Sequence, residues 1–157
     1  MFVSVTGSYK SRREMAEDIA HFSLGLLAPR LRNKLEVDIK LIANLSTKES
    51  VAGDCTWEDN NTRPREFTIR VDSSQALQEM LSTIAHEMVH VKQYARGELK
   101  DTSKSCTHCK WKGKTIEWEK MNYYDHPWEI EAHGREAGIF IRWFEQSKWK
   151  NCKWANY

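Results

Sequence analysis

The sequence lacks the features of a membrane or exported protein. It contains no apolar run of about 18 residues, the length from which a membrane-spanning helix is inferred. Residues 1–20 do not show the basic segment followed by an apolar segment that marks a signal peptide. We therefore expect a soluble, cytoplasmic protein with no membrane partner.

Cysteine is scarce and unevenly spaced. The chain has 4 cysteines, Cys55, Cys106, Cys109 and Cys152, a pattern that does not fit the disulfide framework of a secreted domain. Reduced thiols in a cytosol fit it better. Cys106 and Cys109 form a CxxC pair, which is one half of a structural zinc knuckle, but a lone CxxC is more often a pair of reduced loop thiols. The pair alone is no basis for a second metal site.

An excess of charge of one sign is also missing. The 24 Lys and Arg residues against 22 Asp and Glu residues leave a net charge of +2. This near balance gives no support to a dedicated nucleic-acid or membrane-surface binder. A length of 157 residues suits one domain with one core, since domains most often have about 100 to 150 residues. We predict a single domain over residues 1–157.

The first half of the chain has the periodicity of one helix followed by three strands. Apolar residues at helical spacing predict a helix over residues 11–27, which Pro29 would end. Alternating apolar and charged residues predict a half-buried strand within residues 35–45. Residues 51–59 and 65–72 are typical of two further strands, joined by a turn-forming stretch. The short connections favour an α+β fold with a three-stranded, mainly antiparallel sheet.

A second predicted helix, over residues 75–97, carries the stretch HEMVH. Ser73 and Ser74 offer an N-cap for it, and Gly97 offers a C-cap. At about 100° per residue, His86 and His90 lie on the side opposite to an apolar stripe. That stripe consists of Leu77, Leu81, Ile84 and Met88. The histidines are therefore expected to face away from the main core.

The rest of the chain combines an irregular, aromatic stretch with a final helix. Residues 98–125 have no strong periodicity, although residues 111–118 suggest a short hairpin or a loop. Pro127 suits the first position of a helix that we predict to continue to about residue 149. The expected core positions of that helix are Ile130, Ala137, Ile141 and Phe144.

HEMVH matches the pattern HExxH of a metal-binding helix. Side chains four residues apart lie on one helix face, so His86 and His90 can both reach one ion at roughly 2.0 to 2.1 Å. Glu87 lies about 100° further around the helix, where it can act as general base on a zinc-bound water of pKa about 7. The motif also occurs by chance, with histidines that are ordinary surface or core groups. The capped helix and the stripe opposite the histidines favour the metal site.

Two histidines and a water leave a tetrahedral zinc one protein ligand short. A metzincin would continue as HExxHxxGxxH, but Gln93 and Arg96 replace the glycine and the last histidine, which excludes that class. The remaining candidates are His108, His126, Glu129, Glu131 and His133. We favour Glu129, because the first turn of a helix presents it rigidly. Compensation of the helix dipole would also explain an acidic residue there.

The other candidates have different expected places. His133 lies one turn beyond Glu129 on the same face, where it could orient a ligand or contact the bound water. Glu131 lies about 200° from Glu129 around the helix, so the two cannot bind the same ion. His108 is the alternative third ligand, but it falls in a predicted loop with no rigid element behind it.

Several residues near the final helix could stabilise a tetrahedral oxyanion. Tyr123, Tyr124 and His126 precede that helix and could donate a hydrogen bond to the oxyanion. Packing beside Trp128 explains each of them equally well. Arg135 is a candidate of the same kind.

A family resemblance rests on HEMVHVKQY followed by PWEIEA. These stretches resemble small gluzincin-type metallopeptidases, in which a downstream ExxA followed by Asp, Asn or His completes HExxH. Glu129, Ala132 and His133 match that pattern. The chain also resembles compact HExxH proteins of tailed bacteriophages, which carry a PWExEA helix, and more distantly SprT-like and ImmA/IrrE-like minimal zincins.

The resemblance covers roughly residues 65–144 and implies both a fold and an activity. It implies a minimal zincin fold, in which a twisted sheet borders a cleft and two helices hold one Zn²⁺. Residues 65–72 would then be the edge strand beside the cleft. A phage-encoded protein of this kind would act in the host cytoplasm.

We therefore expect a zinc-dependent peptidase with a protein or peptide substrate. His86, His90 and Glu129 would bind one Zn²⁺, and Glu87 would be the general base. An alternative is a catalytically restricted zinc-binding protein with a regulatory or interaction role, although a structural zinc gains nothing from Glu87. A third hypothesis is a SprT-type DNA-associated protease, in which the Lys and Trp residues of 109–118 contact nucleic acid; the weak net charge counts against it. Nothing in the sequence specifies an oligomeric state.

Overall fold

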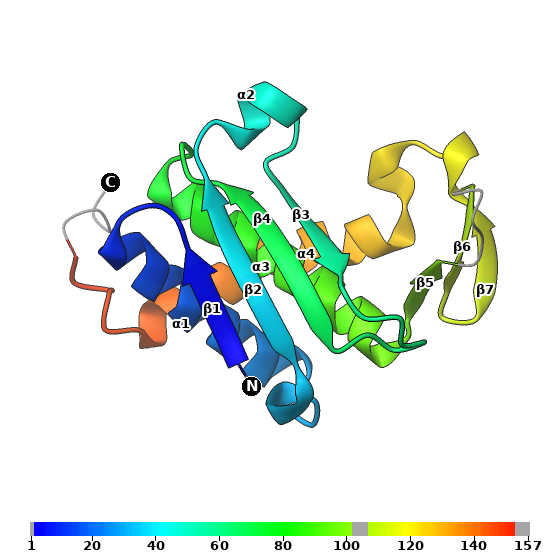
Figure 1. Cartoon of the computed structure of the whole chain (residues 1–157), viewed down its shortest axis with the longest axis horizontal. Coiled ribbons are helices and arrows are strands. Elements are labelled where there is room, and N and C mark those ends of the chain that lie inside the picture. Colours follow the sequence, from blue (N-terminus) through cyan, green and yellow to red (C-terminus); the bar gives the residue numbers. More distant parts are fainter. Residues whose placement is uncertain (1, 102–106, 153–157) are drawn as a thin grey trace.

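The computed structural model describes residues 2–101 and 107–152, which form an α+β fold (Figure 1). In this part of the chain the strands are β1 (Phe2–Thr6), β2 (Glu36–Ile42), β3 (Gly53–Trp57), β4 (Glu66–Asp72), β5 (Leu99–Asp101), β6 (His108–Trp111) and β7 (Lys114–Glu117). The α-helices are α1 (Lys10–Leu27), α2 (Leu45–Glu49), α3 (Leu77–Arg96) and α4 (Pro127–Gln146). Three short 3-10 helices are η1 (Arg32–Lys34), η2 (Trp118–Lys120) and η3 (Tyr123–Asp125).

The main sheet is mixed, with the strand order β1-β2-β4-β3. β1, β2 and β4 are parallel to one another, and only β3 at one edge is antiparallel to its neighbour. The prediction of a three-stranded, mainly antiparallel sheet is therefore wrong. It missed β1, and it placed the strands in sequence order. β4 takes an interior position because residues of both of its faces are buried, which is typical of a parallel strand inside a sheet.

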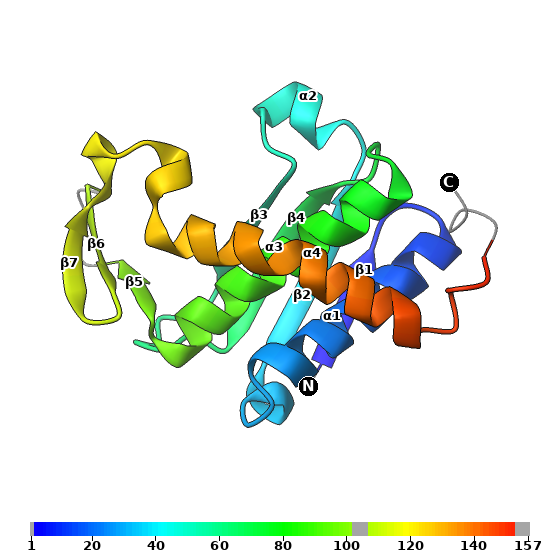
Figure 2. The ribbon, with the colours of Figure 1, turned by 180° about the vertical axis from the view of Figure 1, so that it is seen from behind.

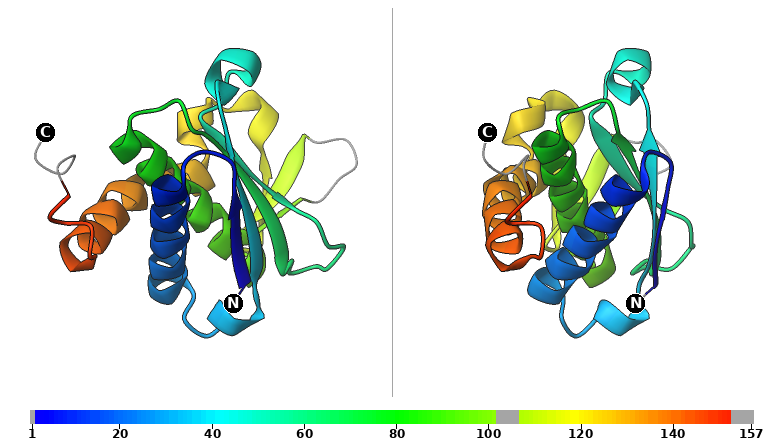
Figure 3. Two further views of the ribbon diagram at one scale, coloured as in Figure 1. Left: turned by 60° about the vertical axis from the view of Figure 1, so that its left-hand side comes forward. Right: turned by 90° about the vertical axis from the view of Figure 1, so that its left-hand side faces the viewer.

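The helices cover one face of this sheet. α1 and α3 lie against the sheet, and α4 lies outside them, as the views from behind and from the side show (Figures 2 and 3). β2 alternates as predicted, with Val37, Ile39 and Leu41 buried beneath the helices. Within the described residues, no helix is both long enough and apolar enough to cross a membrane.

α3 ends where the sequence predicts but begins differently. Gly97 has a φ of 69° and donates its backbone N–H to Gln93 and Tyr94, which confirms the predicted C-cap. The N-cap position is held by Ala76, without a side-chain hydrogen bond. Ser73 and Ser74 therefore do not cap the helix. Ser74 instead lies in a turn around Asp72, whose carboxylate accepts a hydrogen bond from the backbone N–H of Ser74.

α4 buries a different face from the one predicted. Ile130 and Ile141 are 56% and 53% exposed, and Ala137 is also exposed, so the predicted stripe is wrong apart from half-buried Phe144. The buried apolar residues of the helix are Trp128, Ala132, Ile139, Phe140 and Trp143. The rings of Phe140 and Trp143 offer more apolar area than the isoleucines, and their burial in the core with α3 and α1 fixes the rotation of the helix.

β5, β6 and β7 form a separate small antiparallel sheet at one end of the molecule (Figure 1). Lys112 and Gly113 connect β6 to β7, and both have a positive φ, as a two-residue hairpin turn requires. The hairpin suggested by residues 111–118 is thus confirmed. His108 belongs to strand β6, so the prediction that it lies in a loop is wrong.

Candidate metal centre

Three buried side chains from two helices converge at the centre of a cleft. His86 and His90 lie one turn apart on α3, and their Nε2 atoms are 3.2 Å apart. Glu129, in the first turn of α4, directs its carboxylate oxygens at both of them, at 3.3 Å from His86 Nε2 and 3.5 Å from His90 Nε2. All three residues are less than 9% exposed. The structure thus brings together the three residues predicted to bind the metal.

The orientation of both imidazole rings is fixed through their other nitrogen. Nδ1 of His86 lies 2.7 Å from Oε2 of Glu136, and Nδ1 of His90 lies 2.8 Å from Oε1 of Gln93. The Gln93 amide nitrogen donates to the Trp128 carbonyl, which leaves Oε1 as an acceptor. Each Nδ1 therefore carries a proton and donates it, so Nε2 of each neutral ring presents a lone pair to the other ring.

This arrangement fits a divalent ion with tetrahedral geometry. Two imidazole lone pairs that face each other at 3.2 Å repel unless a proton or a metal ion lies between them. Ligands at roughly 2.0 to 2.1 Å from a tetrahedral ion are separated from one another by about 3.3 to 3.4 Å. The three separations of 3.2, 3.3 and 3.5 Å are close to that value. Two imidazole nitrogens and one carboxylate oxygen are also a donor set that suits zinc.

The electrostatics of the cluster likewise favour a cation. Burial disfavours the charged imidazole of His86, but the carboxylates around it, Glu129 first, raise its pKa to about 9. Burial also disfavours the charge of Glu129, yet its contacts with the two histidines hold its pKa well below the ordinary value. The pKa of His90 is raised, because its contacts with Glu129 outweigh its burial. Without a metal ion, the positive charge that the carboxylates favour must come from protons on the two imidazoles.

Comparison with known proteins gives no match. No family model fits the chain, and no curated protein or solved structure is similar to it.

Glu87 lies beside the three converging residues. It is 5% exposed and lines the same cleft. Burial raises its pKa to about 7. A cation bound by the neighbouring histidines would lower that pKa again, because it favours the carboxylate. Glu87 is thus a buried carboxylate beside the three converging side chains.

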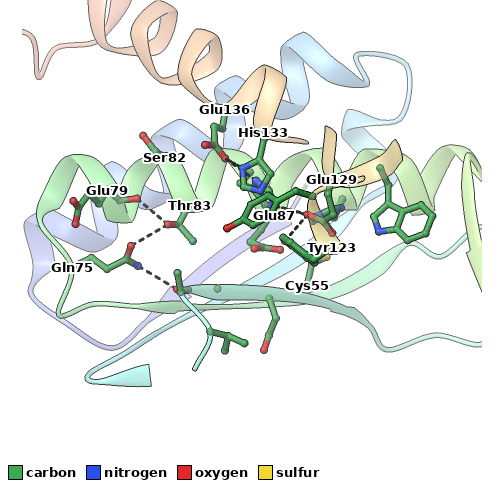
Figure 4. A pocket seen from close by; sticks show the side chains of 18 of the residues that line it. Cys55, Gln75, Glu79, Ser82, Thr83, Glu87, Tyr123, Glu129, His133 and Glu136 are labelled. Carbon is green, nitrogen blue, oxygen red and sulfur yellow. Dashed lines mark hydrogen bonds and ion pairs between the residues drawn. The ribbon is translucent and has the colours of Figure 1, made fainter. Parts of the chain in front are cut away.

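The cleft lies between α3, α4 and the edge strand β3 (Figure 4). Gly53 and Cys55 of β3 line one side, and Thr83 and Glu87 of α3 line the floor. The prediction that residues 65–72 form the edge strand is wrong, because β4 lies between β2 and β3. The hairpin of β3 and β4 folds so that the more apolar strand is interior and the more polar one borders the cleft.

Of the predicted oxyanion candidates, Tyr123 approaches the centre most closely. Its hydroxyl donates a hydrogen bond of 2.6 Å to Oε2 of Glu129. Tyr124 also lines the cleft, but it is 70% exposed and its ring lies 5.8 Å from that of His133. His126 does not line the cleft; it stacks on Trp128, with Nε2 3.2 Å from the Trp118 carbonyl.

His133 and Glu131 occupy different surroundings. The His133 ring lies 4.5 Å from that of His86 at the mouth of the cleft, and its Nδ1 is 3.4 Å from Glu136. The acceptor that orients His86 is thus Glu136, one turn beyond His133. Glu131 points away from the centre, toward the buried ammonium of Lys92 at 2.8 Å. Arg135 also pairs with Glu131, at 3.1 Å, and lies outside the cleft.

The remaining candidates lie far from the centre. His108 is on β6, with Nε2 4.0 Å from Glu117 of β7. Cys109 is buried in a small apolar cluster with Leu99 and Trp128, whereas Cys106 lies outside the described residues. The described residues offer no cysteine to a metal cluster.

Gln93 and Glu136 are the site residues that sequence reasoning missed. Gln93 follows His90 by three residues, so it lies on the same helix face and can reach the ring. Glu136 follows Glu129 by seven residues, which is two helical turns on the same face. That spacing indicates that Glu136 lies on the same face as Glu129. Which residue of α3 it contacts depends on how the two helices cross.

The hydrogen bond from His86 to Glu136 leads to a first prediction. Replacing Glu136 with glutamine removes a charged acceptor that fixes the ring and its tautomer, so the affinity for zinc should fall about 10- to 100-fold. Competition with a chromophoric chelator measures this affinity. Glu145→Gln is the matched control, because Glu145 is an exposed carboxylate on the same helix. An unchanged affinity in Glu136→Gln would mean that this hydrogen bond does not support metal binding.

Proposed function

We propose that the protein is a zinc-dependent peptidase. The observation that carries this proposal is the convergence of two imidazole lone pairs and one carboxylate, with Glu87 left beside them as an uncommitted carboxylate. His86, His90 and Glu129 would hold the ion. A bound Zn²⁺ supplies Lewis-acid chemistry, which brings the pKa of water to about 7 and polarises a carbonyl.

Glu87 performs the proton transfers in this proposal. Its carboxylate accepts a proton from the attacking water as the water oxygen bonds to the peptide carbonyl carbon. When the carbon–nitrogen bond breaks, Glu87 delivers that proton to the leaving amine. Burial suits Glu87 to both tasks, because a carboxyl group with a pKa near neutrality can exchange a proton in both directions.

β3 is the last strand of the main sheet, and no other strand of the described residues pairs with its outer edge, which supports a peptide as the substrate. Ala52 and Asp72 form one hydrogen-bonded pair with β4, and Glu58 and Glu66 form another. Because such pairs alternate along an antiparallel ladder, the N–H and C=O groups of Gly53, Cys55 and Trp57 point away from β4. An extended peptide can add to these groups as a further strand, beside Glu87.

Metal removal tests this proposal. We expect the purified protein to contain about one zinc per chain by elemental analysis, and to cleave unfolded proteins or peptide mixtures. Dialysis against a chelator should abolish cleavage, and Zn²⁺ should restore it, whereas Mg²⁺ should not, because it prefers six oxygen ligands. Zinc-loaded protein that cleaves no peptide in a broad library would favour the regulatory role.

A further inference from the structure

β3 lies along α3, with its inward-facing residues opposite successive turns of the helix. Trp57 packs on Tyr94, with ring centroids 4.6 Å apart, and half-buried Cys55 lines the same cleft as Glu87. Gly53 is the third inward-facing position, because residues of a strand alternate between its faces. The inward groups therefore decrease in size from an indole to a thiol to a hydrogen atom.

The glycine is where the strand comes closest to the helix. A Cβ atom on Gly53 would lie 2.6 Å from Cγ2 of Thr83, 3.1 Å from the Arg70 carbonyl oxygen and 3.2 Å from Oε1 of Glu87. Gly53 is not among the positive-φ glycines of the described residues, so its backbone suits any residue. It is thus the lack of space, and not backbone conformation, that requires a glycine here.

Thr83 cannot easily move out of the way. Its hydroxyl donates to the backbone carbonyl of Glu79, at 2.9 Å, and lies 3.2 Å from Oε1 of Gln75, which holds its rotamer (Figure 4). The Gln75 amide in turn donates to the Ala52 carbonyl, next to Gly53. A side chain at position 53 would therefore have to displace the strand, the Glu87 carboxylate, or both.

We propose that Gly53 is a positioning residue that sets the distance between the substrate-binding edge and the general base. This inference rests on the proposed peptidase function. Gly53 offers its backbone groups to the substrate on the open edge, and its missing side chain lets the Glu87 carboxylate lie directly beneath the same residue. This packing fixes the distance between β3 and the Glu87 carboxylate.

The test uses the zinc-loaded protein and three variants: Gly53→Ala, Thr83→Ser, and the two combined. For Gly53→Ala we expect kcat to fall, by up to about 10²-fold, which is the cost of a misplacement of about 1 Å. Zinc content and KM should change little, because the ligands and the open strand edge remain. The melting temperature should fall, because the added methyl group overlaps Thr83.

The double variant separates positioning from folding. Serine at position 83 removes the methyl group at 2.6 Å, so the melting temperature should recover, but Glu87 still meets the new methyl group and kcat should stay low. The kcat of the double variant is compared with that of Thr83→Ser alone. Recovery of kcat together with the melting temperature would show that Gly53 is only structural and would overturn the proposal.

Crystal structures of the zinc-loaded wild type and of Gly53→Ala provide a readout that does not depend on activity. We expect the Glu87 carboxylate, or β3 at residue 53, to be displaced in the variant. An unmoved carboxylate and strand would refute the positioning role even if the protein proves not to be a peptidase. Failure of the peptidase function would instead appear as wild-type protein without cleavage.

Discussion

Replacing Glu87 with glutamine should lower the rate of peptide cleavage by about 10²- to 10⁴-fold, the usual contribution of a general base. The amide has nearly the same shape as the carboxylate but cannot take a proton from water. Glu87 does not belong to the group of converging ligands, so zinc should remain bound with one ion per chain. Cleavage rate and zinc content are therefore measured on the same sample.

Two comparisons make this result specific to Glu87. Glu145→Gln changes an exposed carboxylate outside the cleft, and it should cleave like the wild type. A Glu87→Gln variant that cleaves as fast as the wild type would rule out Glu87 as the base. A variant that loses its zinc would show instead that Glu87 contributes to holding the ion.

Replacing Glu129 with alanine should abolish tight zinc binding. The two histidines would keep their orientation through Glu136 and Gln93, but the ion would lose one of its three protein ligands. The loss of affinity should exceed the roughly 10- to 100-fold expected for a residue that only orients a ligand, such as Glu136. Cleavage should disappear together with the metal.

Elemental analysis after dialysis, with a chelator competition, measures this effect. Glu145→Ala is the control on the same helix. Full zinc occupancy in Glu129→Ala would mean that another side chain completes the site. His133 would be the first alternative, because its ring already lies 4.5 Å from that of His86.

Local periodicity predicted most of the helices and strands but not how the strands pair. The helix at residues 10–27, strand β2 and helix α3 follow from apolar spacing over a few turns or pleats. The parallel pairing of β1 with β2, and the interior place of β4, depend on contacts between residues far apart in sequence. Short connections suggested a meander, yet the chain passes through α2 to the far edge before it returns as β4.

In the candidate site, too, the placement of residues within one helix could be predicted, whereas contacts between helices could not. His86, Glu87 and His90 share one helix, so their relative placement follows from helical geometry. The prediction that Glu129 lies near them rested on the rigidity of a helical first turn. The role of Glu136 depends on the rotation of α4, which the choice of Ile130 and Ile141 as core residues had assigned wrongly.

The hydrogen bonds at Nδ1 of the two histidines have a thermodynamic consequence. Because both Nδ1 atoms already donate their protons, any proton taken up by the metal-free site goes to Nε2, the atom that must bind the ion. Below the pKa of about 9 at His86, uptake of a metal ion is thus an exchange that releases protons. Acidification works against loading twice, since it protonates the imidazoles and then neutralises the carboxylates. Occupancy of the site by a metal ion would therefore depend on the proton concentration of the surrounding solution.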